Sequence, residues 1–328
     1  MKKSLTLLAF ALGMSCAYGQ DLTSKKGEPI LPEAGDWGLG VDATPFLDYM
    51  GNFFGKTTSN AAPTFNFLAY NTQMITYRYF QDANTVYRGA LRIGLGGPTV
   101  REQEVDRSYT APTLTNNGYP DPKPALVENE WKNRTTTIGL SGGIEIRKGK
   151  TRLQGYYGGE VGIFFSSSRD KFTYGNNLAV NVTPGGPGTP QDVTPDNDDA
   201  ITGANNVTSA SGLGISGANG NGLARVTERK NGAIFEVGLR GFIGCEYFLL
   251  PKISLGGEFG WGLGLATQGA GKTTYESTGN KNAASTANDD TIGTTEIKGA
   301  KQGSFTIDTD NKNSMWAPAG TIRLNFYF

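Results

Sequence analysis

The stretch IFEVGLRGFIGCEYF, residues 234–248, alternates between two kinds of residue. The first set is apolar and consists of Phe235, Val237, Leu239, Ile243, Cys245 and Tyr247. The second set is charged or small and consists of Glu236, Gly238, Arg240, Gly244 and Glu246. Successive side chains of a β-strand point to opposite faces, so the stretch predicts a strand with one apolar and one polar face. The strand is also longer than most strands of soluble domains.

Seven other segments have the same character, which gives eight predicted strands at residues 36–48, 66–81, 86–97, 134–147, 151–166, 232–248, 252–266 and 314–328. Three of the connections between these strands are short. The other four are long and cover residues 49–65, 98–133, 167–231 and 267–313. Short and long connections alternate strictly, as they do in outer-membrane barrels. We therefore predict an all-β fold, an eight-stranded antiparallel up-and-down transmembrane β-barrel with short periplasmic turns and four long extracellular loops.

The N-terminus has the organisation of a secretory signal. Two lysines and the apolar core LTLLAFALGM precede a small-x-small motif that ends at Gly19. This pattern predicts a signal peptide over residues 1–19, cleaved between Gly19 and Gln20. The mature chain would have a periplasmic leader at residues 20–35 and an outer-membrane barrel at residues 36–328, with both termini in the periplasm.

Composition argues against several classes of function. The chain has 30 basic and 30 acidic residues, so no net positive field indicates a nucleic-acid partner. It contains no histidine, a frequent general base and zinc ligand, so we predict no enzymatic activity, no cofactor and no metal site. The stretch ATQGAGKT, residues 266–273, fits a relaxed phosphate-loop pattern, but no helical pattern follows it. We therefore predict no nucleotide binding.

The interior of an eight-stranded barrel is just wide enough for side chains to fill. Parity places six acids and six arginines on the inward face: Asp42, Arg78, Arg88, Arg92, Glu145, Arg147, Glu160, Glu236, Arg240, Glu246, Glu258 and Arg323. Unpaired charges would be costly there, whereas arginines and carboxylates can share several hydrogen bonds. Inward glycines such as Gly158 and Gly260 would leave room for the arginines. The pattern predicts a lumen plugged by a salt-bridge network.

Aromatic residues gather near both ends of the predicted strands. Those near the short turns are Trp37, Tyr77, Tyr79, Tyr87, Tyr247, Phe326 and Phe328. Those near the long loops are Trp131, Phe165, Phe235 and Trp316. Aromatic girdles at both interfaces are typical of membrane barrels, so this placement supports short turns in the periplasm.

With these features the chain resembles the OmpA-like family of small outer-membrane β-barrels. The resemblance is carried by the export signal, the alternating strands, the stretch GCEYFLLPKISLGGEFGWG (residues 244–262) and the terminus TIRLNFYF (residues 321–328). It implies insertion by the barrel-assembly machinery, for which Phe326 and the terminal Phe328 would form the assembly signal. We expect no peptidoglycan-binding domain, because the sequence ends on its last predicted strand.

These patterns indicate the cellular location and the fold of the protein more clearly than its function. The leading hypothesis is a non-enzymatic integral outer-membrane protein that serves envelope structure and surface contacts. The alternatives are a narrow or gated porin for ions or small solutes, and an adhesin that binds a partner through its loops. The expected partners are outer-membrane lipids and lipopolysaccharide. The sequence names no ligand for the loops and leaves their calcium binding and the oligomeric state open.

Overall fold

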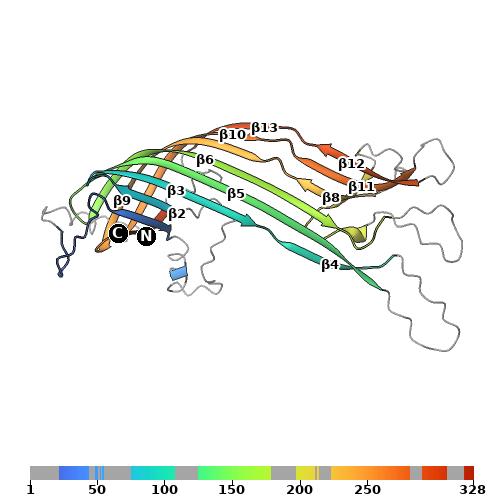
Figure 1. Cartoon of the computed structure of the whole chain (residues 1–328), viewed down its shortest axis with the longest axis horizontal. Helices are drawn as coiled ribbons and strands as arrows, with labels where there is room; N and C mark the ends of the chain where they lie inside the picture. Colours follow the sequence, from blue (N-terminus) through green and yellow to red (C-terminus); the bar gives the residue numbers. More distant parts are fainter. Residues whose placement is uncertain are drawn as a thin grey trace, which may run out of the picture.

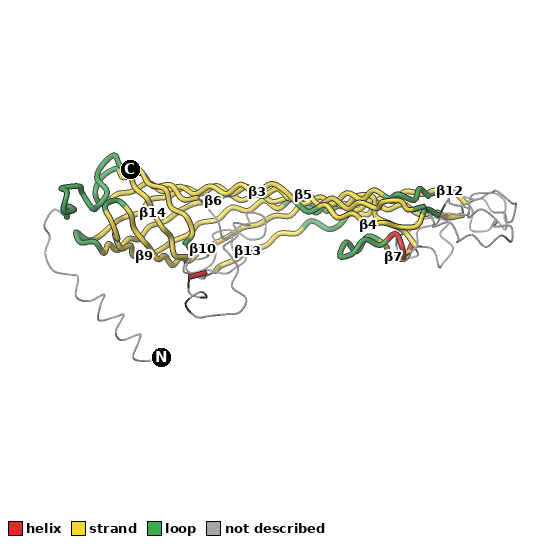
Figure 2. Tube along the Cα trace, turned by 90° about the horizontal axis from the view of Figure 1, so that it is seen from below, coloured by secondary structure: helices red, strands yellow, loops and turns green. Residues whose placement is uncertain are grey.

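The structure, a computed structural model, describes residues 22–43, 49, 50, 52, 54, 75–107, 125–178, 197–210, 213, 223–280, 290–308 and 321–328. It is an elongated antiparallel β-structure (Figure 1). At one end the strands curve around one another, and some of them continue as a long narrow arm, as Figure 2 shows. Gly19 and Gln20, the predicted cleavage site, lie outside the described residues.

Within the described residues, one sheet contains 14 strands, more than the eight predicted. The strands are β1 (Trp37–Asp42), β2 (Ile75–Phe80), β3 (Thr85–Gly96), β4 (Thr99–Val105), β5 (Leu126–Lys148), β6 (Leu153–Thr173), β7 (Val207–Ser209), β8 (Leu223–Lys230), β9 (Ile234–Leu250), β10 (Ile253–Gln268), β11 (Lys272–Asn280), β12 (Asp290–Lys298), β13 (Gln302–Asp308) and β14 (Thr321–Tyr327). A short 3-10 helix, η1 (Asn197–Asp199), precedes β7. In the described part of the chain, no helix is long and apolar enough to cross a membrane.

Eight of these strands pair in a cycle, which we call the ring. In order around the cycle, the pairs are β1–β2, β2–β3, β3–β5, β5–β6, β6–β9, β9–β10, β10–β14 and β14–β1. Every pair is antiparallel. The pairing returns to its first strand, so each ring strand has a paired neighbour on both sides.

The three short connections of the ring lie at the end where β14 finishes. In the first of them, Asp82 accepts hydrogen bonds from the backbone N–H groups of Asn84 (2.7 Å) and Thr85 (2.8 Å), which fix a tight turn and lower the pKa of the Asp82 carboxyl. The second turn contains Gly149 at φ +125°, a conformation that favours glycine. The turn between β9 and β10 places Lys252 at φ 56°. Local turn chemistry thus joins three pairs of neighbouring strands.

The other six strands lie in segments that the sequence analysis predicted to be external loops. β5 and β6, of 23 and 21 residues, run past the ring, and β8, β11 and β12 add to the edge of β6 (Figure 1). β4 pairs with the outer half of β5, β7 pairs with β8, and β13 pairs with the outer half of β10. We call residues 99–107, 126–135, 168–178, 197–210, 223–230, 272–280 and 290–298, which include β4, β7, β8, β11 and β12, the extension.

Side chains along the ring strands alternate between the exposed outer face and the buried inner face. On β3, Leu91 and Ile93 are exposed, whereas Arg88 and Arg92 are buried. On β9, Leu239 and Ile243 are exposed beside the buried Arg240, as the sequence pattern predicts. The ring is therefore apolar outside and charged inside, the reverse of a water-soluble sandwich.

Candidate functional site

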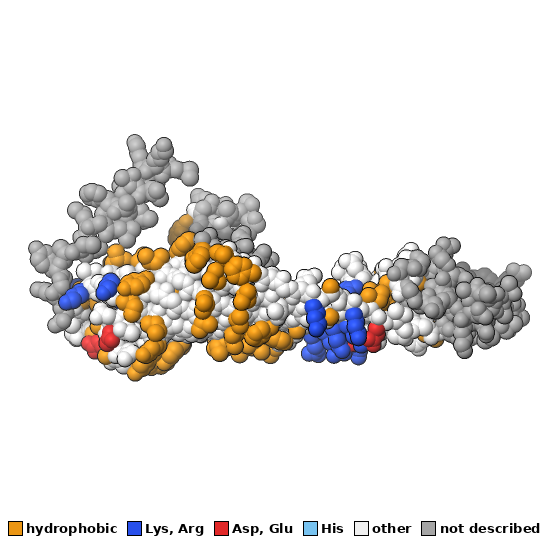
Figure 3. Space-filling model, turned by 90° about the horizontal axis from the view of Figure 1, so that it is seen from above, with side chains coloured by type: hydrophobic (Ala, Val, Ile, Leu, Met, Phe, Trp, Pro, Cys, Tyr) orange, Lys and Arg blue, Asp and Glu red, His pale blue; other side chains and the backbone are white. Residues whose placement is uncertain are grey.

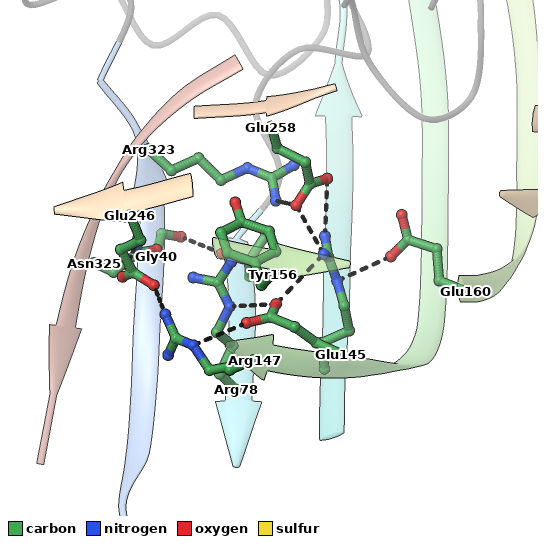
Figure 4. A network of polar contacts seen from close by, with 12 residues as sticks. Gly40, Arg78, Glu145, Arg147, Tyr156, Glu160, Glu246, Glu258, Arg323 and Asn325 are labelled. Atoms are coloured by element: carbon green, nitrogen blue, oxygen red, sulfur yellow. Dashed lines mark hydrogen bonds and ion pairs between the residues drawn. The ribbon is translucent and has the colours of Figure 1, made fainter. Parts of the chain in front are cut away.

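Nine of the twelve predicted interior charges form one network of ion pairs inside the ring (Figure 4). The network consists of Arg78, Arg88, Arg147, Arg240, Arg323, Glu145, Glu160, Glu246 and Glu258. Each side chain is buried, with at most 9% of its residue surface exposed. Charges this deep are tolerated only when they are paired and hydrogen-bonded.

Two glutamates are the centres of the network. Glu258 Oε2 lies 2.8 Å from Arg88 Nη1, and its Oε1 lies 2.6 Å from Arg240 Nη1. Arg323 approaches the same carboxylate at 3.8 Å. Glu145 Oε2 accepts a hydrogen bond of 3.1 Å from Arg78 Nε. Since each carboxylate meets more than one guanidinium, the removal of one acid would leave several cations without full compensation.

Glu246 is held mainly by hydroxyl and amide donors. Tyr327 donates its hydroxyl to Glu246 Oε1 at 2.5 Å, and Asn325 donates through Nδ2 at 3.0 Å. Ser254 and Arg147 also donate to this carboxylate. Tyr327 is an interior residue that the sequence pattern did not predict, although it has the same parity as the inward Arg323.

Aromatic rings lie between the arginines. The guanidinium carbon of Arg88 is 4.0 Å from the centroid of Phe242, and that of Arg78 is 5.3 Å from the centroid of Tyr156. Arg147 lies 5.1 Å from the ring of Phe80. Cations above aromatic faces are attracted by the ring quadrupole, more strongly where water is excluded. The interior is therefore filled by alternating cations, carboxylates and rings.

Inward glycines provide the space for these side chains, as predicted. A methyl group on Gly260 would collide with the guanidinium of Arg240, and one on Gly158 would collide with the carbonyl oxygen of Ile144 and with the ring of Phe242. A methyl group on Gly257, which points outward from β10, would meet nothing within 4 Å. On β10, Gly260 thus leaves room for Arg240 on the inner face, whereas Gly257 on the outer face has open space around it.

The other three predicted interior charges are Arg92, Asp42 and Glu236. Arg92 is buried, four residues beyond Arg88 on β3. Asp42 and Glu236 are only partly buried, and both lie on the side of the ring away from the short turns. The network therefore occupies the half of the interior nearer the short turns.

The N-terminal leader covers the interior at the short-turn end. Ile30 is 1% exposed and packs in a cluster with Phe80, Val86, Phe248 and Tyr327. Its carbonyl accepts a hydrogen bond of 3.0 Å from the backbone N–H of Lys252, in the turn between β9 and β10. The side chain of Lys252 also pairs with Asp36 at 2.8 Å. The leader is thus anchored across the mouth of the ring by the buried Ile30 side chain and by polar contacts with the strands and turns of the ring.

The aromatic residues predicted near the short turns lie on the outside of the ring. Trp37 is 42% exposed, and its ring stacks on the terminal Phe328 with centroids 4.8 Å apart. Phe326 is half-buried on the same face of β14. At the other rim Phe165 and Phe235 are exposed, whereas Trp131 packs in the extension against Phe172, and Trp316 lies outside the described residues.

The extension has a small core and a buried polar cluster of its own. Phe172, Tyr174 and Val226 pack together, and the Tyr174 hydroxyl donates to the Val226 carbonyl at 2.5 Å. Asp199, fully buried, accepts from Arg225 at 3.1 Å and from Arg107 at 3.2 Å. Burial raises the pKa of the Tyr174 phenol well above its usual value. These contacts give the extension a defined shape.

The stretch that fits a phosphate loop lacks the geometry of a nucleotide site. Lys272, from the stretch that fits a phosphate loop, is the first residue of β11, so a strand follows where a helix is needed. Its ammonium group pairs with Glu296 at 2.6 Å. Among the described residues, no three His, Cys, Asp or Glu side chains are grouped as a metal site would require.

The chain has little similarity to known proteins that could indicate its function. No family model matches the chain, and no curated protein matches it. Among solved structures it is similar to the outer membrane protein OprG from Pseudomonas aeruginosa, with 11% identity over 91% of this chain and 98% of that chain. The TM-score of 0.27 is too low to argue from.

Proposed function

We propose that the ring is an eight-stranded transmembrane β-barrel, and that the protein is a non-enzymatic outer-membrane protein with a plugged lumen. One observation carries the proposal, namely the cyclic pairing of strands whose exposed face is apolar and whose inner face is charged. Leu95, Ile243 and Val161 are 68%, 62% and 54% exposed. A belt of such residues would be an aggregation surface in water and is the ordinary exterior of a membrane barrel.

The height of the apolar belt supports the same proposal. On β9 the exposed residues run from Phe235 to Tyr247. Twelve steps of about 3.4 Å, on a strand tilted by about 40°, give a height of roughly 30 Å. That height is close to the hydrocarbon thickness of a bilayer. The export signal and the aromatic residues near the short turns favour an outer membrane, with those turns and both termini in the periplasm.

Two features support a closed lumen. The salt-bridge network fills the half of the interior nearer the short turns, and the leader covers that end through Ile30. An ion would have to displace buried guanidinium and carboxylate groups that already pair with each other. We therefore propose that the interior holds the barrel together and that contacts with the surroundings are made by the extension.

The proposal is tested by refolding the mature chain into lipid vesicles and planar bilayers. We expect a folded form whose gel mobility shifts on heating, and a bilayer with no stable conductance steps. Reproducible conductance steps would favour the narrow porin instead. Failure of the folded chain to enter bilayers would contradict the membrane assignment.

A further inference from the structure

The extension carries a row of basic residues across five neighbouring strands. In the sheet register Arg134 is opposite Arg169, Arg169 is opposite Lys230, Lys230 is opposite Lys272, and Lys272 is opposite Lys298. Residues that are directly opposite in an antiparallel sheet point to the same face. These five residues, the basic ladder, therefore form one line on one face of the extension.

A second row reinforces the ladder. Lys132 and Lys171 are opposite each other, two residues further out on β5 and β6. Acids on this face pair with basic neighbours: Glu128 with Arg101, Glu130 with Arg101 and Lys132, Glu228 with Arg169 and Lys230, and Glu296 with Lys272. The basic residues of the two rows, together with Arg101, outnumber these acids, and Figure 3 shows the resulting basic patch with a small acidic area beside it.

Like charges directly opposite in a sheet destabilise the pairing. The ladder places like charges opposite each other in four consecutive strand pairs. Its side chains also remain accessible, with 54% of the Arg169 side chain and 48% of the Lys230 side chain exposed. An anionic ligand bound along this accessible line of cations would reduce the repulsion between them.

The position of the ladder identifies the anion. Along β5 and β6 the outward pairs are Ile138 with Phe165, then Thr136 with Ser167, then Arg134 with Arg169. The same face therefore changes from apolar to hydroxyl to basic with increasing distance from the ring. Four residues of about 3.3 Å on a tilted strand place the ladder roughly 10 Å above the last apolar pair. The headgroup layer extends about 5–8 Å beyond the hydrocarbon core, so the long arginine and lysine side chains of the ladder can reach back to it.

We propose that the basic ladder binds the phosphates of phosphorylated glycolipid headgroups in the leaflet from which the extension emerges. Figure 3 shows the basic patch directly beyond the hydrophobic surface of the ring, on the same side of the molecule. Each accessible arginine or lysine near an anionic lipid surface strengthens binding about fivefold. The acids on the same face reduce that gain. This inference rests on the proposed membrane embedding.

The test uses the refolded mature chain in maltoside micelles and fluorescent bisphosphorylated lipid A as the probe. In one variant four ladder residues are neutralised: Arg134→Gln, Arg169→Gln, Lys230→Gln and Lys272→Gln. The matched control neutralises four lysines at the short-turn end: Lys25→Gln, Lys26→Gln, Lys148→Gln and Lys150→Gln. We expect the ladder variant to bind lipid A at least about tenfold more weakly, and the control to change by less than about twofold.

Equal changes in the two variants would overturn the proposal. Should the ladder variant fail to fold, the wild-type chain still decides, because it must bind bisphosphorylated lipid A more tightly than the dephosphorylated lipid and lose that preference at high salt. Displacement of lipid A by inorganic phosphate at constant ionic strength would identify a free-anion site and refute the lipid assignment. A chain that inserts into phosphatidylcholine bilayers but shows no preference for lipid A refutes only this inference. A chain that does not insert refutes the proposed function.

Discussion

Replacement of Glu258 by glutamine tests whether the interior network stabilises the ring. The Glu258 side chain is 1% exposed and lies within ion-pair distance of Arg88, Arg240 and Arg323. Glu258→Gln keeps the shape of the side chain but removes the charge that compensates these three guanidinium groups. Breaking a buried ion pair by removing one partner costs about 3–5 kcal/mol, so we expect a loss of that size in the free energy of unfolding.

The measurement is denaturant unfolding of the vesicle-embedded protein, followed by circular dichroism and corrected for any change in slope. Glu296→Gln provides the matched control, since Glu296 pairs with Lys272 on the accessible face of the extension. Surface ion pairs contribute little, so this variant should unfold like the wild type.

A loss of less than about 1 kcal/mol for Glu258→Gln would refute the reasoning. It would mean that water compensates the three arginines. A hydrated interior would then favour the porin alternative, and the same variant should be examined for conductance in a planar bilayer.

Three further outcomes follow from single residues. Gly260→Ala should lower stability by about 1–3 kcal/mol in the same unfolding assay, because the added methyl group displaces Arg240, whereas Gly257→Ala on the outer face of the same strand should be tolerated. Tyr174 has a raised pKa in the folded state, so its stabilising effect should be complete below about pH 10 and be lost as the pH rises through the folded-state pKa. Ultraviolet absorbance of the phenolate should show that Tyr174 titrates at a higher pH than an ordinary tyrosine. Titration at the ordinary pKa would contradict its burial. Ile30→Ala should loosen the leader and increase hydrogen exchange of its amides, without changing exchange in the extension.

Period-2 alternation located the ring strands because the ring has two different environments. A residue such as Leu239 faces outward and its neighbour Arg240 faces inward, so the two faces differ in chemistry at every step. The inward aromatic residues were missed because apolar residues were assigned to the outer face. Parity alone places Phe242 beside Arg240 on the inside, and the cation–π contacts explain why a ring is stable there.

The strands of the extension carried no comparable signal. The segment KTTYEST of β11 is rich in Thr and short polar residues, so its two faces differ little in hydrophobicity. Such a segment becomes a strand because its main chain completes hydrogen bonds with β8 and β12, which lie on either side of it in the sheet. The burial of Ile30 is likewise a tertiary contact between distant parts of the chain, which local periodicity does not report.

Strand continuity sets the height of the basic ladder above the ring. β5 and β6 pair residue for residue from Glu130 with Thr173 to Lys148 with Gly155, without a register shift. A loop on flexible hinges would sample many heights and lose conformational entropy when it met a lipid surface. Two continuous strands avoid most of that cost, because the register that directs apolar side chains outward in the ring also directs Arg134 outward in the extension. The unusual length of β5 and β6 therefore connects the two proposals, since the ring fixes the depth in the bilayer and the same strands present the cations at the phosphates.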